Sequence, residues 1–185
     1  MSLQNASQED ITEWVKSFHR ASDSLTTTDL GKYYTKNGSL KFANNELLVG
    51  LDAINTVLHI PALLNISHMA CITREFVTDI NLKFFGTTFP LLSSMKHEIV
   101  NLDVIDNKIY QTCTITYTVK DDPQNRTIKI LAMGVFHLVP GADFKSGEPI
   151  IERFDVFLDG SEVFGVIGEL QKLKPARNRW MNQKE

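Results

Sequence analysis

The sequence predicts an α+β protein in which helices form the first third and a meander of long β-strands forms most of the rest. Apolar residues recur at helical spacing between residues 11 and 25. Between residues 95 and 160, four segments of strand-like alternation are separated by turn-forming residues. Strands of this length twist, so we expect the sheet to curl into an open cone that the helices close. Polar side chains that point into such a cone would lie in an apolar cavity.

The first helix is marked by a capping signal and an apolar stripe. Ser7 precedes an acidic residue three positions later, Asp10, an arrangement that satisfies free N–H groups at the start of a helix. The stripe that follows has the 3.6-residue period of a helix and comprises Ile11, Trp14, Val15, Phe18 and Leu25.

Three shorter elements are expected before residue 62. Thr26 to Asp29 repeats the capping signal ahead of a second helix, over 29–34, that Gly38 would end. A hairpin is expected over 39–49, because the asparagines at 44 and 45 tolerate the positive φ that a two-residue turn requires. A third helix is expected from Leu51 onward, bent or ended by Pro61.

Residues 62–94 have mixed helical and strand signals, and we interpret them as an irregular insert over a pocket. The stretch 53–73 has no charged residue, but its proline and several polar side chains argue against a membrane span. Four strands follow, with turns or loops between them, and a short amphipathic segment precedes a flexible basic tail from about residue 175. The strands are expected at 97–105, 109–119, 127–139 and 150–158.

Length and charge limit the classes of protein that the chain can be. A chain of 185 residues is expected to form one domain, and a net charge of −3 provides no basic surface for nucleic acid. Two cysteines, at 71 and 113, cannot frame a disulfide scaffold, and the N-terminus shows no signal peptide. We therefore expect a cytoplasmic protein that binds neither nucleic acid nor membrane.

The order of these elements resembles the NTF2-like superfamily and its SnoaL-like branch, which includes ketosteroid isomerases, scytalone dehydratases, limonene epoxide hydrolases and polyketide cyclases. The resemblance rests on four segments in order: Tyr33 to Phe42, Gly50 to Ile54, Lys96 to Ile99 and Phe154 to Gly160. It implies a single cone-shaped domain over 1–185, with three N-terminal helices packed on a strongly curved, mostly antiparallel mixed sheet. It also implies acid–base chemistry on a hydrophobic small molecule, without a metal or an organic cofactor, in a homodimer.

Three catalytic candidates follow from this resemblance. Asp23 is similar to an acidic position near the substrate of scytalone dehydratases, and His97 to a pocket histidine of the same enzymes. Asp155 is similar to an acid on the last strand of SnoaL-like proteins and epoxide hydrolases. The chain departs from ketosteroid isomerases because 41–45 contains no carboxylate, and it lacks the closely spaced Arg and Asp set of epoxide hydrolases.

Each candidate also has a structural interpretation. An imidazole titrates near neutral pH and suits proton transfer, but His97 could instead bond to a neighbouring loop. Asp155 alternates with Arg153 and could form an ion pair with it at a sheet edge. Asp23 near a helix C-terminus is unfavourable for the helix dipole, so it lies either in a turn or in the pocket.

Six further residues are candidates for substrate binding, although Trp14, Phe18 and Tyr33 could instead be plain core residues and His137 a buried histidine with a satisfied hydrogen bond. His19 is excluded because its neighbour Arg20 suggests an exposed edge. The candidates are Trp14, Phe18, Tyr33, Tyr117, His137 and Phe157.

Two classes of function remain open. The favoured one is an isomerase, dehydratase or cyclase, in which His97, with Asp155 or Asp23, moves a proton, with natural-product tailoring as one setting. The alternative is a non-catalytic domain that binds a small molecule or a protein, since one fold serves both. For the homodimer, the threonine-rich strand face of Thr112 to Thr118 is a candidate surface.

Overall fold

The computed structural model describes residues 6–25, 29–42, 48–49 and 89–181. Two α-helices, two 3₁₀ helices and six strands lie in these ranges. In chain order they are α1 (Gln8–Asp23), η1 (Leu30–Tyr33), β1 (Tyr34–Phe42), β2 (Leu48–Val49), η4 (Phe89–Leu91), β3 (Leu92–Ile105), β4 (Lys108–Val119), β5 (Thr127–Leu138), β6 (Ile151–Leu158) and α4 (Ser161–Met181).

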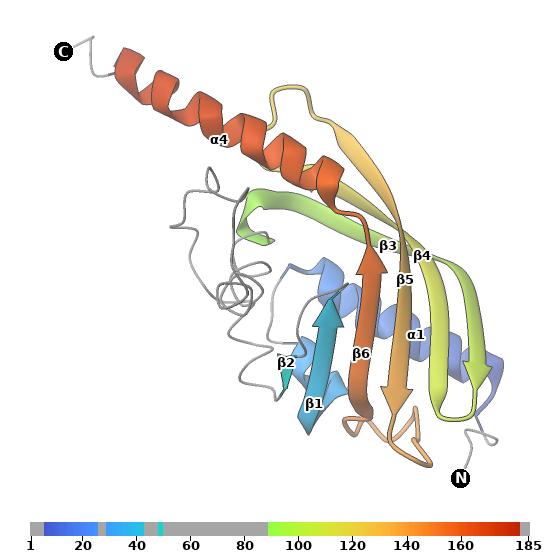
Figure 1. Cartoon of the computed structure of the whole chain (residues 1–185). Helices are drawn as coiled ribbons and strands as arrows, with labels where there is room; N and C mark the ends of the chain where they lie inside the picture. The colour runs from blue at the N-terminus through green and yellow to red at the C-terminus, as the bar shows by residue number, and fades with distance from the viewer. Residues whose placement is uncertain (1–5, 26–28, 43–47, 50–88, 182–185) are drawn as a thin grey trace, which may run out of the picture.

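The strands form one mixed sheet in the order β2-β1-β6-β5-β4-β3 (Figure 1). The last four strands pair antiparallel with their sequence neighbours, and this confirms the predicted meander. β1 joins β6 in parallel and pairs antiparallel with β2, which confirms the two arms of the early hairpin. The turn at residues 44 and 45 lies outside the described residues.

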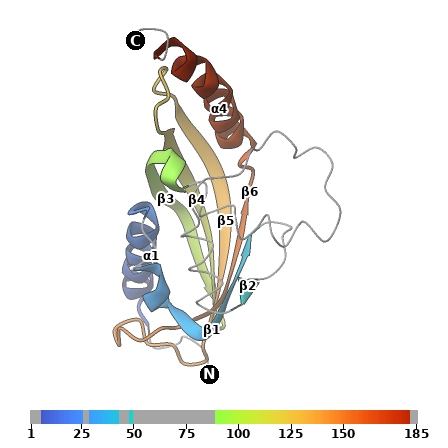
Figure 2. The ribbon, with the colours of Figure 1, turned by 90° about the vertical axis from the view of Figure 1, so that its left-hand side faces the viewer.

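The two helices cover different parts of the inward face of the sheet. Figure 2 shows α1 beside this face and α4 at the opposite end of the strands. α1 packs on a core that includes Phe136, Leu138 and Ile151, and α4 packs on a second core around Ile115 and Ile128. Each helix therefore closes one end of the curved sheet, and a space remains between the two cores.

The start of α1 agrees with the prediction: the Asp10 backbone N–H donates to Ser7 Oγ at 3.1 Å. The second helical segment is a 3₁₀ helix, and Tyr34 already belongs to β1. Gly38 was predicted to end a helix, and this prediction is wrong. The residue lies inside β1, where the pairing with β6 shifts register. A Cβ atom at Gly38 would lie 2.9 Å from the Thr35 carbonyl oxygen and 3.0 Å from that of Ile151. Glycine is required there because the backbones approach closely at a bulge.

Three other predictions need correction or fall outside the described residues. β3 begins at Leu92, so residues 92–94 belong to the sheet and not to the insert. α4 continues through Pro175 to Met181, so the segment predicted as a tail is helical up to that residue. Pro175 removes one backbone N–H donor from this helix but does not end it. The third expected helix lies outside the described residues, and three N-terminal helices are therefore not confirmed.

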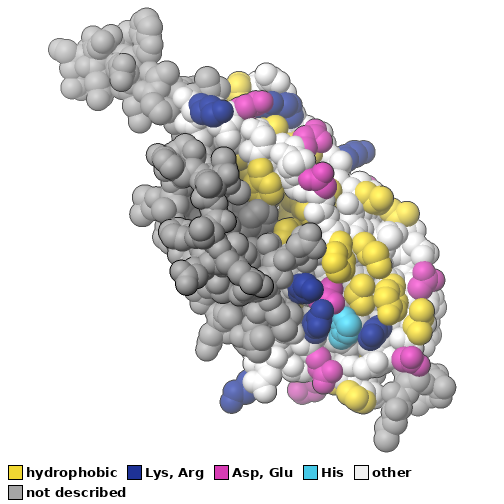
Figure 3. Space-filling view, in the orientation of Figure 1, with side chains coloured by type: hydrophobic (Ala, Val, Ile, Leu, Met, Phe, Trp, Pro, Cys, Tyr) yellow, Lys and Arg dark blue, Asp and Glu magenta, His cyan; other side chains and the backbone are white. Residues whose placement is uncertain are grey.

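The outward face of the sheet is open in the described part of the chain (Figure 3). The threonines of β4 lie on this face, as predicted, because the alternate positions Ile109, Cys113 and Ile115 are buried. Large apolar side chains are also exposed: Val100, Ile105, Leu131, Met133 and Phe157. No helix within the described ranges is long and apolar enough to span a membrane.

An ionic cluster ties the turn between β4 and β5 to α4. The Asp122 carboxylate accepts from the backbone N–H groups of Gln124 and Arg126, at 3.2 and 2.9 Å, and from Arg126 Nε at 3.0 Å. Arg126 Nη1 also donates to Glu169 Oε2 of α4 at 2.7 Å. Hydrogen bonding to the Arg126 side chain is the main cause that lowers the pKa of Asp122 to about 2.

We expect Asp122→Asn to lower the melting temperature at pH 7, because asparagine cannot replace the charge-assisted bonds of the carboxylate. The depressed pKa adds stability that is fully present above pH 3.8 and is lost as the pH falls through about 2. The gap between the variant and the native chain should therefore close between these two pH values in thermal unfolding followed by circular dichroism. Asp121→Asn, at the exposed neighbouring position, is the control and should change little. A gap that persists at pH 2 would contradict this account.

Candidate functional site

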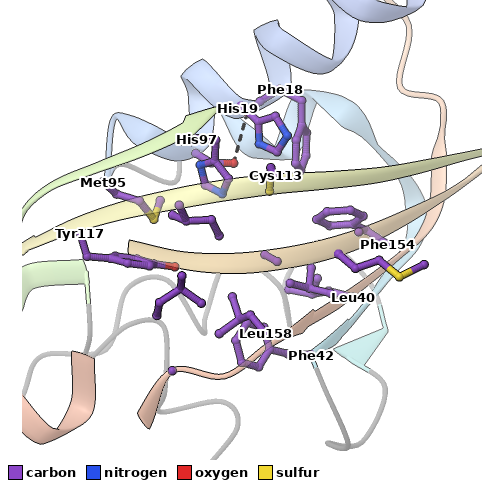
Figure 4. A pocket seen from close by; sticks show the side chains of 18 of the residues that line it. Phe18, His19, Leu40, Phe42, Met95, His97, Cys113, Tyr117, Phe154 and Leu158 are labelled. Carbon is purple, nitrogen blue, oxygen red and sulfur yellow. Dashed lines mark hydrogen bonds between the residues drawn. The ribbon is translucent and has the colours of Figure 1, made fainter. Parts of the chain in front are cut away.

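A cavity of about 120 Å³ lies between the two cores, with α1 and β3 on one side and β1 and β6 on the other (Figure 4). Its lining is mostly apolar, and includes Phe42, Met95, Phe154 and Leu158. Figure 4 shows His19 and His97 together at one wall, opposite Phe42 and Leu158. The two imidazoles therefore share one wall of a mostly apolar chamber.

Asp23 and His97 form a hydrogen-bonded pair. Asp23 is the last residue of α1, and its two carboxylate oxygens accept from His97 Nδ1 at 2.6 Å and from the His97 backbone N–H at 3.0 Å. The His97 side chain is 11% exposed and that of Asp23 is 21% exposed. Because Asp23 holds the proton on Nδ1, Nε2 of the neutral imidazole is the atom free to accept a proton.

A second histidine is stacked on His97. The His19 ring lies nearly parallel to the His97 ring, with centroids 4.3 Å apart and an interplanar angle of 17°. His19 precedes Asp23 by one helical turn, so both reach the sheet from the same face of α1. Its Nε2 atom is 2.8 Å from Gln111 Oε1 of β4.

Burial is the main cause that lowers the pKa of His19, to about 4, and the neighbouring His97 adds to the shift. The Gln111 hydrogen bond and the Asp23 charge oppose it. His19 is therefore neutral at physiological pH.

The remaining polar groups of the lining are also uncharged. Burial raises the pKa of the Cys113 thiol to about 11, with a smaller effect from the Asp23 charge. Burial likewise raises the pKa of the Tyr34 and Tyr117 phenols. The two phenols line the cavity and make no hydrogen bond to the part of the chain that the structure describes, so both can donate to a ligand.

Of the predicted catalytic residues, the structure brings Asp23 and His97 together and separates them from Asp155. Phe154 and Val156 line the cavity, so the alternation of a strand turns Asp155 to the outward face. There Asp155 accepts from Arg153 Nε at 2.6 Å and lies 3.1 Å from His137 Nε2. The prediction that Asp155 reaches the cavity is wrong, and its structural alternative, an ion pair with Arg153, is what the structure shows.

Of the six residues predicted to bind substrate, Phe18 and Tyr117 line the cavity. Trp14 and Tyr33 do not, because they pack with Phe136 and Phe18 in the aromatic core beneath α1. Tyr33 also donates to Ser17 Oγ at 3.1 Å, so its hydroxyl is already used.

His137 and Phe157, the last two of these candidates, lie on the outward face of the sheet. Phe157 is 42% exposed and pairs with Met133, and His137 pairs with Arg153. Both residues follow the predicted strand alternation, but the sequence does not say which of the two faces turns inward.

Two polar residues of the lining, His19 and Gln111, are not among the residues predicted from the sequence. His19 was set aside because of Arg20, yet it is 4% exposed, whereas Arg20 is exposed. Its position four residues before Asp23 was the available signal. Gln111 lies between Ile109 and Cys113 in the buried register of its strand, and a lone amide in such a register indicates a polar contact inside the fold.

No protein-family model and no curated protein sequence matches the chain. Solved structures do match it. A candidate SnoaL-like polyketide cyclase from Jannaschia sp. CCS1 has a TM-score of 0.55 at 12% identity, over 89% of this chain and 96% of that one. PrhC from Penicillium brasilianum has a TM-score of 0.58 at 8% identity, over 91% and 93%. An NTF2-like protein of unknown function from Burkholderia pseudomallei has a TM-score of 0.53 at 10% identity, over 85% and 97%.

The chain has the NTF2-like fold that SnoaL-like proteins share. This confirms the predicted resemblance at the level of the fold. At identities this low the likeness concerns the fold, and the chemistry has to be argued from the cavity.

We expect the pKa of His19 to be visible in the stability of the protein. Below pH 6.5 the unfolded chain binds a proton at His19, whereas the folded state does not bind it until about pH 4. The free energy of unfolding therefore decreases as the pH falls from 6.5 to about 4. At roughly 1.4 kcal/mol per pH unit this loss amounts to about 3 kcal/mol. Urea unfolding at pH 7, 6, 5 and 4 should show it in the native chain and show less in His19→Gln. An NMR titration of the His19 ring with a midpoint near 6.5 would contradict the prediction.

Proposed function

We propose that this protein is a cofactor-independent acid–base enzyme, an isomerase, dehydratase or cyclase, that acts on a hydrophobic small molecule in the cavity. The observation that supports it is the Asp23–His97 pair at the wall of an otherwise apolar chamber. A histidine that is oriented by a carboxylate and faces a mostly apolar cavity is a competent general base.

In this mechanism His97 Nε2 takes a proton from a carbon next to a carbonyl group of the bound molecule. The C–H bond breaks, an N–H bond forms, and the electron pair moves to the carbonyl oxygen as an enolate. Asp23 stabilises the imidazolium that results and holds the ring in place. The imidazolium then returns the proton to the same or another atom, or to a leaving hydroxyl group. The Tyr34 and Tyr117 phenols are available to donate to the developing oxyanion.

The solved structures support the class of molecule. One neighbour of the same fold is a candidate polyketide cyclase, and polyketides are rich in carbonyl groups. Within the described lining no lysine or arginine is present, so the cavity suits an uncharged molecule better than a carboxylate or a phosphate. Natural-product tailoring is one setting that provides such substrates.

A non-catalytic carrier is the alternative, and the mostly apolar lining is the observation that favours it. The two proposals differ in what His97 does. In a carrier its loss would change only the binding of the ligand, whereas in an enzyme it removes proton transfer from a ligand that still binds.

We further propose that the outward face of the sheet pairs two copies of the chain. Its exposed apolar side chains include Leu131, Met133 and Phe157, which lie on the neighbouring strands β5 and β6. A mixed surface of this kind, with charged residues such as Arg153 around it, is typical of a protein interface.

We expect the protein to catalyse hydrogen–deuterium exchange at carbons next to the carbonyl of simple ketones in D₂O, followed by ¹H NMR. The panel would run from cyclohexanone to 1-tetralone. His97→Gln should lower the exchange rate by about 10² to 10⁴, the usual contribution of a general base, while binding is retained. Asp23→Asn should lower it less, because the imidazole remains. Exchange of the whole panel at the rate seen with His97→Gln would overturn the catalytic proposal and leave the carrier.

We expect the native chain to sediment as a dimer and Leu131→Glu to sediment as a monomer, because a charge would be buried without a partner at the interface. Gln8→Glu, an exposed change on α1 away from this face, is the control and should leave the dimer intact. A native chain that sediments as a monomer at micromolar concentration would contradict the homodimer.

A further inference from the structure

The mechanism proposed above leaves His19 and Gln111 without a role, although both line the cavity and both are almost completely buried. A buried polar pair costs free energy of solvation, and this pair is joined by one hydrogen bond of 2.8 Å between side chains 92 positions apart. Within this pair, the His19 ring is stacked on the ring of His97, the proposed base.

Hydrogen-bonding capacity decides which atom of the pair donates. His19 Nδ1 is buried without a partner among the described residues. A proton on this atom would be an orphaned N–H group, which is rare in proteins, whereas an unpartnered acceptor is tolerated better. The neutral ring therefore has its proton on Nε2, and Nε2–H donates to Gln111 Oε1.

This donation fixes the direction of the Gln111 amide. With Oε1 bound to His19, the NH₂ group has to point the other way, along the wall toward Gly134. A Cβ atom at Gly134 would lie 2.8 Å from Gln111 Nε2 and 2.9 Å from Phe154 Cε2. The glycine thus leaves the space that the amide occupies, and Phe154 on its other side lines the cavity.

The NH₂ group is left available to a ligand. No acceptor for it is found in the described chain, and it is not sealed off in the way that His19 Nδ1 is. One wall of the cavity therefore presents an acceptor, His97 Nε2, and a donor, Gln111 Nε2, from neighbouring strands.

We propose that Gln111 donates a hydrogen bond to the carbonyl oxygen of the substrate and that His19 is the positioning residue that holds its amide in the donating direction. This inference rests on the proposed proton transfer for its chemistry, but not for its geometry. The oxygen that binds Gln111 is the one on which charge develops when His97 removes the neighbouring proton. A donor that is already oriented toward this oxygen lowers the barrier without reorganisation.

His19 suits this role because it stays neutral. A charged imidazolium stacked on His97 would compete for the Asp23 carboxylate and repel a protonated His97. The charged and titratable groups packed around it in the described chain are His97 and Asp23, and both belong to the catalytic pair.

Two substitutions at position 19 separate the hydrogen bond from the packing. His19→Gln retains a donor at about the position of Nε2, whereas His19→Phe retains the stacked ring and loses the donor. The first readout is the side-chain NH₂ signals of Gln111 in a ¹H–¹⁵N spectrum, assigned by their absence in Gln111→Leu. We expect the two signals to be displaced from the positions of a free glutamine amide in the native chain and in His19→Gln, and to lie near those positions in His19→Phe.

The second readout uses cyclohexanone and methylenecyclohexane, which share a shape and differ in the carbonyl oxygen. Cyclohexanone should shift the Gln111 NH₂ signals of the native chain, and methylenecyclohexane should not. In the ketone exchange assay, His19→Phe should lower the maximal rate by about tenfold with little change in the half-saturating ketone concentration, and His19→Gln should recover most of it.

The two proposals fail in different ways. Unchanged Gln111 signals in His19→Phe, or equal shifts from the ketone and the hydrocarbon, would overturn the positioning role even if His97 proves catalytic. Absence of exchange, together with Gln111 signals that respond to cyclohexanone and depend on the His19 donor, would overturn the catalytic function and leave Gln111 as a carbonyl-binding group.

Discussion

The contact between Asp23 and His97 is the interaction on which the site depends. It joins the last residue of α1 to β3 at two points, the ring and the backbone of His97. A carboxylate at the C-terminal end of a helix is unfavourable for the helix dipole, and two accepted hydrogen bonds offset this cost. The same contact sets the imidazole tautomer, so the packing of the helix on the sheet and the chemistry of the cavity share one geometry.

Burial determines how the polar groups of the cavity behave. The cause of the low pKa of His19 and of the raised pKa of Cys113 is burial in both cases, and both groups stay neutral for this reason. Electrostatic interactions are stronger where water is excluded, so few polar groups are sufficient for binding or proton transfer. The rest of the described lining is mostly apolar.

The two faces of the sheet have separate tasks because side chains alternate along each strand. On β6, Phe154 and Val156 line the cavity, while Asp155 and Phe157 lie on the outward face with His137 of β5. Asp155, a catalytic candidate in the sequence, thus lies on the face of the sheet away from the cavity. Gln111, which the sequence did not single out, lines the cavity. The cavity lies on the inward side of the curved sheet, and exposed large apolar residues lie on the outward side.

The sequence by itself determined α1 and the last four strands, since capping at Ser7, the period of α1 and the alternation of these strands are local signals. It also singled out Asp23 and His97 as separate candidates, and a resemblance carried by the order of elements was enough for the fold. It could not decide which face of β6 turns inward, and so Asp155 was placed in the cavity. Nor could it pair His19 with Gln111, because that contact exists only after α1 has docked across β3 and β4 in one register. Periodicity is set by neighbours along the chain, whereas the inward direction and the partners of a polar group are set by curvature and packing that arise when distant segments meet.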